Sequence, residues 1–221
     1  MFASGSGSNF QALLDQEHAG SSSWTTALLV TDRESAGALD RASRAGVSGR
    51  VVSYRGRSLD EVAAELSEAL DEAGVEVIFL AGFLRLVPED VVARFRDRIL
   101  NIHPALLPAF GGEGMWGHHV HEAVLASGAR LSGPTVHLVD ERFDEGRIVA
   151  QWPVQVRSDD TPDSLAARVL AVEHLLYPRA AEHLCSALRE GRAPGPLELP
   201  QDAFDPHPLT VTLPSRTTLD P

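Results

Sequence analysis

Two polar residues capable of chemistry stand two positions apart at the end of an apolar stretch, in the segment LNIHPALLPAF (residues 100–110). In an open α/β sheet the carboxyl ends of the strands face the ligand crevice, so a strand ending here delivers Asn101 and His103 to it. The Asn amide can donate to a developing oxyanion, and the imidazole can donate to it or move a proton. Alternatively, Asn101 is an ordinary turn residue at a strand end and His103 is a buried core histidine. This segment alone does not decide between the structural and the catalytic interpretation.

A second group of polar residues lies further along the chain. Thr135 and His137 alternate in an apolar run, so they share one face of a predicted strand. Asp144 follows in the segment DERFDEG (140–146), where an Asp is most often a turn residue but is also an available acid or base.

The N-terminal segment SGSGSNFQALL (4–14) places glycines directly before a helical pattern. Successive backbone N–H groups at such a helix start form a cradle for phosphate. Phe10 stands where the dinucleotide fingerprint requires a third Gly, so that fingerprint is excluded. A flexible Gly/Ser start is the alternative interpretation.

The segment from residue 111 to residue 122 combines glycines with potential metal ligands. Two His with a carboxylate suit zinc or iron, and the candidates are His118, His119, His121, Glu113 and Glu122. The four glycines between residues 111 and 117 favour a mobile loop, however, and we expect no metal.

Composition excludes several functional classes. All 19 basic residues are Arg, so Schiff-base chemistry, pyridoxal phosphate and a Walker phosphate loop, which need Lys, are excluded. A net charge of −12 with dispersed acidic residues argues against a nucleic-acid or membrane surface. Cys185 is the single cysteine and sits in a helical apolar pattern, which fits core packing in a reducing cytoplasm. The absence of a signal-like or membrane-length apolar run predicts a soluble cytoplasmic protein.

The hydrophobic pattern predicts an α/β fold, doubly wound around a mainly parallel sheet with helices on both faces. Apolar strands are expected at 24–32, 50–55, 75–83 and 98–103, separated by helices such as 59–74. The runs 133–140 and 147–156 leave no room for a helix between them and predict an antiparallel hairpin. A helix should begin after Thr161, with Pro162 at its first position and a kink or break at Pro178. From residue 191 a Pro-rich tail follows, and the pattern at 210–214 suggests one edge strand in it.

Five motifs occur in an order that closely resembles the phosphoribosylglycinamide formyltransferases, folate-dependent enzymes of purine synthesis. They are GSGSN (5–9), LAGFLRLV (80–87), ILNIHPALLPAF (99–110), GPTVHLVDERFDEG (133–146) and EHLLYP (173–178). The resemblance covers about residues 3–190. It implies a formyltransferase domain at 1–190, with a phosphoribosyl half-site at about 1–97 and a folate and catalytic half at about 98–190, followed by the tail at 191–221.

The resemblance also implies roles for individual residues. Asn101, His103 and Asp144 would be catalytic, with Thr135 and His137 in support. The substrates would be held by a larger set: Gly7, Ser8 and Asn9 at the phosphate, Glu173 at the glycinamide, and Leu84, Arg85, Leu86, Val87, Asn101 and Arg57 at the folate. Asp144 beside His103 should favour the imidazolium. The co-substrate would be 10-formyltetrahydrofolate, without a metal, in a monomer or homodimer.

Two departures from the family pattern are visible. The loop from Gly111 to Gly117 is longer than usual, which suggests a lid. Only Met1 to Ala3 precede the phosphate loop, so the first, central strand is truncated, and either the native start lies upstream or Met1 to Ser4 form a short strand with an empty slot behind it.

Three rival functions share parts of this pattern. A 10-formyltetrahydrofolate hydrolase would use the same Asn, His and Asp, but usually carries an extra N-terminal regulatory domain. A tRNA formyltransferase would need a basic C-terminal domain. A catalytically silent phosphate-binding module predicts a degraded triad, whereas all three residues are present here.

Overall fold

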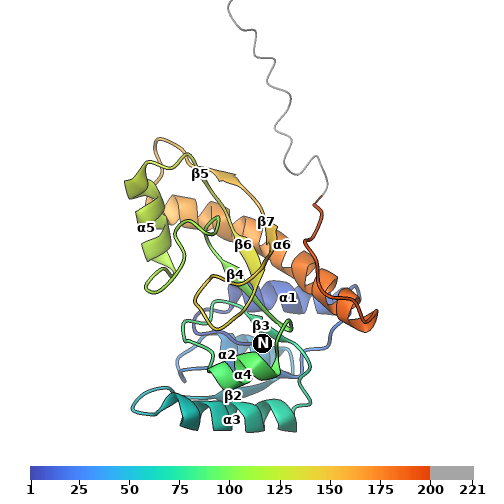
Figure 1. The fold of residues 1–221 in the computed structure, drawn as a ribbon. Helices are drawn as coiled ribbons and strands as arrows, with labels where there is room; N and C mark the ends of the chain where they lie inside the picture. Colours follow the sequence, from blue (N-terminus) through green and yellow to red (C-terminus); the bar gives the residue numbers. More distant parts are fainter. Residues whose placement is uncertain (200–221) are drawn as a thin grey trace, which may run out of the picture.

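The structure is a computed structural model that describes residues 1–199, and its strands form one main sheet and one small one (Figure 1). Strand β1 pairs in parallel with β2, and β3 pairs in parallel with β4. Antiparallel pairing continues from β4 to β6 and from β6 to β7. The short strands β5 and β8 pair with each other in a second sheet. The strand bounds are β1 Leu28–Thr31, β2 Ser48–Val51, β3 Ile78–Leu80, β4 Ile99–His103, β5 Leu131–Ser132, β6 Thr135–Leu138, β7 Ile148–Gln151 and β8 Val154–Gln155.

The first residues of the chain join the two parallel pairs into one sheet. Phe2 forms parallel bridges with both Val30 and Leu80. Its N–H donates to Phe79 O at 2.8 Å, and the Met1 ammonium donates to Leu28 O at 2.6 Å. The predicted short first strand is therefore present, and it lies in the centre of the sheet with strands on both sides.

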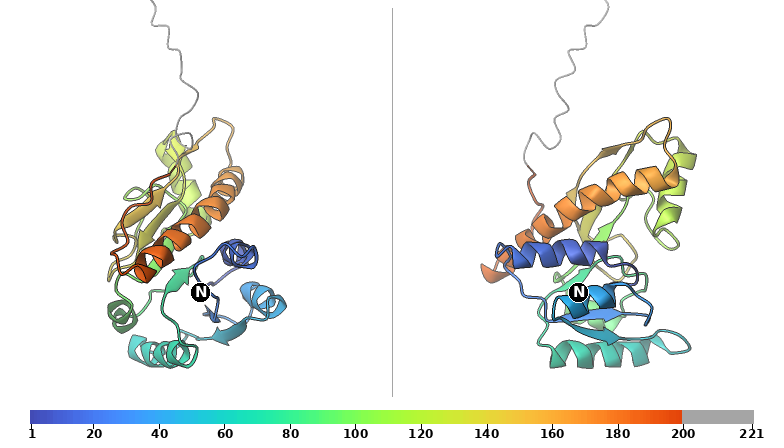
Figure 2. Two further views of the ribbon diagram at one scale, coloured as in Figure 1. Left: turned by 90° about the vertical axis from the view of Figure 1, so that its right-hand side faces the viewer. Right: turned by 180° about the vertical axis from the view of Figure 1, so that it is seen from behind.

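Helices cover both faces of the sheet, as predicted (Figure 2). One core cluster packs α1, α2 and α6 against one face, and the other packs α3 and α4 against the opposite face. Within β1, Leu29 belongs to the first cluster while Leu28 and Val30 belong to the second, as strand alternation requires. The helix bounds are α1 Ser8–His18, α2 Ala38–Arg44, α3 Leu59–Glu72, α4 Glu89–Arg94, α5 His118–Ser127 and α6 Pro162–Arg189.

Helix α6 confirms one local prediction and corrects another. Thr161 caps it, with its hydroxyl accepting from Ser164 N, and Pro162 takes the first position. The helix runs through Pro178 without interruption, so a break there was wrong. The Tyr177 side chain next to Pro178 is fully buried and reaches Leu80 O and Leu100 O at 2.9 Å each, which fixes this turn to the sheet.

The predicted hairpin is confirmed, but its second strand is shorter than expected. β7 ends at Gln151, and Pro153, which has no N–H to donate, separates it from β8. After α6 the chain returns to the edge of β7, where Leu197 N donates to Val149 O at 2.8 Å. The suggested strand at 210–214 lies outside the described residues. Among residues 1–199 no helix is long and apolar enough to cross a membrane.

Candidate active site

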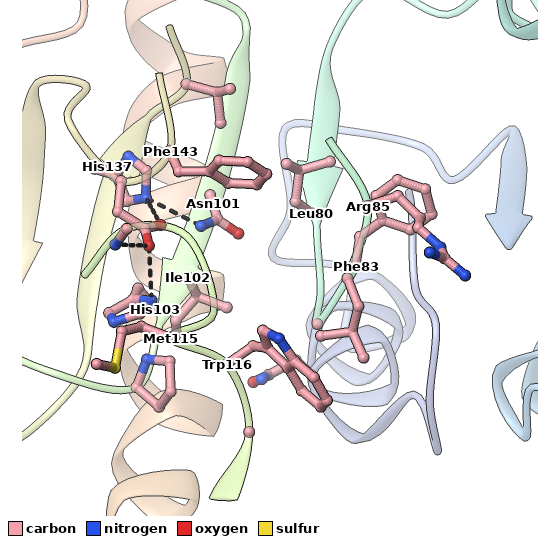
Figure 3. Close-up of a pocket in the computed structure, with 18 of the residues that line it drawn as sticks. Leu80, Phe83, Arg85, Asn101, Ile102, His103, Met115, Trp116, His137 and Phe143 are labelled. Carbon is pink, nitrogen blue, oxygen red and sulfur yellow. Dashed lines mark hydrogen bonds and ion pairs between the residues drawn. The ribbon is translucent and has the colours of Figure 1, made fainter. Parts of the chain in front are cut away.

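Strand β4 delivers Asn101 and His103 to the carboxyl edge of the parallel strands, and β6 supplies their neighbours. The register pairs Asn101 with His137 and His103 with Thr135. Asn101 Nδ2 lies 3.0 Å from His137 Nε2, while His137 Nδ1 donates to Leu138 O at 3.0 Å. With Nδ1 protonated, His137 Nε2 accepts one amide N–H of Asn101. The second N–H of that amide is then available to the pocket, into which Asn101 extends (Figure 3).

The hairpin loop between β6 and β7 brings Asp144 to the two histidines. Asp144 Oδ2 lies 3.4 Å from His103 Nδ1, and Oδ1 lies 3.5 Å from His137 Nε2. Gly112 N donates to the same carboxylate at 3.0 Å. Asp144 has a positive φ of 56°, a conformation that Asp tolerates better than most residues. The three predicted catalytic residues therefore form one connected cluster.

The protonation state of His103 depends on two opposing effects, burial and the neighbouring Asp144. Burial lowers the pKa of His103, and the opposing effects of Asp144 and of the Phe110 carbonyl are weaker. The pKa of Asp144 is also lowered: burial would raise it, but the two neighbouring histidines and the bond from Gly112 N outweigh burial. Asp144 therefore favours the imidazolium, as expected, but burial of the His103 ring outweighs its effect. His103 is neutral near pH 7, and its Nε2–H donates to Phe110 O at 2.8 Å.

Thr135 supports the site through the loop that follows β4. Its hydroxyl donates to Ala105 O at 2.6 Å and accepts from Leu107 N and Gln151 Nε2 at 3.0 Å each. Because this side chain is fully buried, the three bonds fix the loop that leaves His103.

The predicted phosphate cradle forms the start of α1. The first intrahelical bond runs from Gln11 N to Gly7 O, so the N–H groups of Ser8 and Asn9 have no acceptor within the helix. Gly7 has a φ of +73°, and a Cβ on it would lie 2.8 Å from the Cβ of Ala38. Two features therefore disfavour any side chain at position 7: the positive φ of the backbone and the close contact with Ala38.

The structure brings the phosphate cradle together with Glu173 from α6. Asn9 Nδ2 donates to Glu173 Oε2 at 2.5 Å, and both residues are buried. Burial raises the pKa of Glu173 to about 7, although the bond from Asn9 acts in the opposite direction. The amide oxygen of Asn9 has no hydrogen-bond partner among residues 1–199. These two side chains thus offer a carboxyl group of variable charge and a free acceptor beside the cradle.

One pocket of about 540 Å³ connects the two groups of residues (Figure 3). Asn9 and Glu173 line it, and so do all three members of the catalytic cluster. The predicted segment from Leu84 to Val87 forms part of the opposite wall. Arg57 does not line this pocket; its guanidinium binds Glu65 and donates to the carbonyls of Ser53 and Glu61.

Sequence reasoning missed the aromatic residues of the pocket. Phe83, Trp116 and Phe143 line it, and Trp116 and Phe143 are about half exposed at 48% and 44%. Their apolar surface suits a flat heterocycle or an aromatic ring. Exposed aromatic residues in two loops carry no periodic signal, so only the folded chain reveals that they face one space.

The histidine-rich segment does not assemble a metal site in the described part of the chain, where no group of three or more potential ligand side chains is suitably arranged. The prediction of no metal remains a prediction. His121 lines the pocket, is 4% exposed, and its Nδ1 has no hydrogen-bond partner within the described residues. Burial, with smaller contributions from His118 and His103, lowers the pKa of His121 to about 4, so its imidazole is neutral.

Comparisons with known proteins agree with this geometry. A formyl transferase family model matches residues 1–181. The chain is 44% identical over 197 residues to the chloroplastic phosphoribosylglycinamide formyltransferase of Arabidopsis thaliana, spanning 88% of this chain and 68% of that protein. Glycinamide ribonucleotide transformylase 1 from Symbiobacterium toebii matches with a TM-score of 0.79 at 39% identity, over 84% of this chain and 86% of that one. The phosphoribosylglycinamide formyltransferase from Bacillus halodurans matches with a TM-score of 0.78 at 34% identity, over 86% and 95%. Since the family model spans most of its length, the chain belongs to the formyl transferase family.

Proposed function

We propose that this protein transfers the formyl group of 10-formyltetrahydrofolate to the amino group of phosphoribosylglycinamide, a step of de novo purine synthesis. The observation that carries the proposal is the single pocket lined at once by Asn9, Glu173 and the catalytic cluster. A substrate whose phosphate binds the cradle at Gly7, Ser8 and Asn9 can extend along this pocket towards Asn101.

The chemistry requires charge stabilisation and proton transfer. The substrate amine attacks the formyl carbon, the formyl oxygen gains negative charge, and the bond from that carbon to folate N10 then breaks. An N–H of Asn101 is available to the oxygen, and loss of one such donor typically raises the barrier by about 3–4 kcal/mol. The amine loses a proton and N10 gains one. A water held by ionised Asp144 is suited to carry that proton.

His103 must change partners to take part. In this structure its Nε2–H donates to Phe110 O. For the imidazole to donate to the formyl oxygen, Nε2 has to exchange that carbonyl for the substrate. Phe110 is followed by Gly111 and Gly112, whose freedom would allow the exchange. This assigns the loop from Gly111 to Gly117 a role as a lid over the folate.

The folate is assigned to the wall opposite Asn101. Leu84, Arg85, Leu86 and Val87 would border the pterin, and the aromatic residues Trp116 and Phe143 would cover apolar parts of the co-substrate. Glu173 would accept from the glycinamide end. The phosphoribosyl half-site would take most of its residues from about 1–97 and the folate and catalytic half from about 98–190 of one domain at 1–190, with the wall at Leu84–Val87 and Glu173 each contributing across that division. No metal would take part.

A coupled assay with both substrates tests this function, because transfer releases tetrahydrofolate and formylated product in equal amounts. A hydrolase would release formate without phosphoribosylglycinamide, and a silent module would bind both ligands without turnover. Asn101→Ala serves as the inactive control. Tetrahydrofolate formed at the same rate without the phosphoribosyl substrate would refute the proposal in favour of hydrolysis.

Two coarser expectations accompany the proposal. The enzyme would act in the cytoplasm on small-molecule substrates, without nucleic-acid or membrane partners. It would be a monomer or homodimer, which sedimentation at several concentrations would distinguish.

A further inference from the structure

A buried carboxylate outside the catalytic cluster lies directly behind the folate wall. Asp32 directly follows β1, and its side chain is 1% exposed. Arg85 Nε donates to Asp32 Oδ2 at 2.8 Å, and Arg33 donates to both carboxylate oxygens, at 3.2 and 2.9 Å. Figure 3 shows Arg85 on the wall opposite Asn101, with its guanidinium directed away from that residue.

Ser4 links Asp32 to a second residue of the same wall, Leu84. The Ser4 hydroxyl accepts from Leu84 N at 2.9 Å and donates to the Asp32 carboxylate. Ser4 N also donates to Gly82 O at 3.0 Å. Asp32 therefore holds two successive residues of the wall, Arg85 directly and Leu84 through one hydroxyl.

The Asp32 carboxylate is ionised, and the three side chains around it donate hydrogen bonds to its charged form. Burial alone would raise the pKa of Asp32, but hydrogen bonds from Arg33, Ser4 and Arg85 lower it below its usual value. The side chains of Arg33 and Arg85 remain 43% and 46% exposed, so water could solvate both if the carboxylate were absent. Neither guanidinium group is buried, so the folded chain does not need Asp32 to neutralise them. This favours a role for Asp32 in positioning the Leu84–Arg85 wall.

We propose that Asp32 is a positioning residue that sets the Leu84–Arg85 wall for the folate co-substrate. The inference rests on the proposed function, since it names what prepares the folate half of that same pocket. Preorganisation of this kind lowers the ordering cost of binding, so its loss should appear in folate affinity rather than in the chemical step. Arg33 shares the carboxylate but does not line the pocket, which makes it a matched control.

The test compares Asp32→Asn with Arg33→Gln in the full chain. Asp32→Asn keeps the shape of the side chain and should raise KM for 10-formyltetrahydrofolate about tenfold, as expected for one charge-assisted hydrogen-bond network, with kcat changed by less than about twofold. Arg33→Gln should leave both parameters within about twofold. Binding of 5-formyltetrahydrofolate, followed by fluorescence, should weaken in parallel with KM.

The outcomes separate the inference from the proposed function. An unchanged KM with a lower melting temperature, or an equal KM increase in Arg33→Gln, would overturn the positioning role. If the wild-type chain shows no turnover but binds 5-formyltetrahydrofolate in an Asp32-dependent way, the proposed function fails and the inference survives. If it does not bind folate at all, both fail. Should Asp32→Asn not fold, Ser4→Ala removes the second connection and should raise KM for folate in the same direction.

Discussion

In a chain that begins at Met1, the terminal amino group lies inside the sheet, and we predict that it makes the free energy of unfolding depend on pH. Burial lowers its pKa from 8.0 to about 5. Between these values the unfolded chain binds a proton that the folded chain does not, so stability falls as the pH drops from 8 to 5. Three pKa units at about 1.4 kcal/mol each amount to roughly 4 kcal/mol. That loss is a large part of a typical stability of roughly 5–15 kcal/mol.

A chain extended by four apolar residues before Met1 should remove this dependence. The parallel bridges of Phe2 with Val30 and Leu80 imply that an added residue directly before Met1 would lie between Leu28 and Ile78. The extension would replace the ammonium by a peptide N–H that can donate to Leu28 O. Urea unfolding of both chains at pH 5, 6, 7 and 8.5 measures the difference. We expect the extended chain to be more stable by an amount that grows as the pH falls.

Chemical acetylation of Met1 provides the matched control, because it removes the charge while adding little apolar surface. A stability difference between the two chains that is constant over pH would mean that only added burial matters and that the ammonium is not desolvated. Equal stability at every pH would refute the reasoning altogether, and the slot before Met1 would then not accept a strand.

Three further predictions concern the site. Single changes in the catalytic cluster should each lower turnover by about a hundredfold or more with substrate binding retained, and should be non-additive in combination: Asn101→Ala, His103→Ala and Asp144→Asn. Gly7→Ala should weaken inorganic phosphate and phosphoribosyl substrate binding at least about tenfold, because its Cβ meets Ala38, whereas Gly5→Ala, with nothing within 4 Å, should not. Glu173→Gln should increase the free energy of unfolding more at pH 8 than at pH 5, since the folded carboxyl ionises only near pH 7. Retained turnover in any catalytic variant, equal effects of the two glycine variants, or a pH-independent Glu173 effect would contradict the respective assignment.

Much of the site could be predicted because its signals are local in sequence. The apolar run ending in Asn101 and His103 predicted a strand end at the ligand edge, and β4 ends at His103. The two apolar runs around ERFDEG predicted the hairpin that carries Asp144. Each of these inferences needs only alternation, turn chemistry and the rule that ligands bind at the carboxyl ends of parallel strands.

The features that escaped prediction depend on contacts between distant segments. Asp32 meets Ser4 and Arg85 only because β1, the first residues and β3 lie side by side in the sheet. The protonation state of His103 depends on its burial and on a loop carbonyl seven residues away, neither of which leaves a periodic pattern. Arg57 was expected at the folate, but in the folded chain Glu65 of α3 binds its guanidinium.

Two buried groups make the free energy of unfolding depend on pH in opposite directions, and their ranges overlap between pH 5 and pH 7. The Met1 ammonium destabilises the fold as the pH falls, whereas Glu173, with a pKa raised from 4.5 to about 7, destabilises it as the pH rises. In a chain that begins at Met1 these two contributions offset each other in this window. The buried rings of His103 and His121 add a further loss of stability as the pH falls, so variants are needed to separate the contributions. Glu173 lowers stability near neutral pH while lining the substrate pocket, where a non-polar side chain would pack without that cost. A buried carboxyl group that lowers stability at this position is better explained by the proposed contact with the glycinamide substrate than by the packing of the fold.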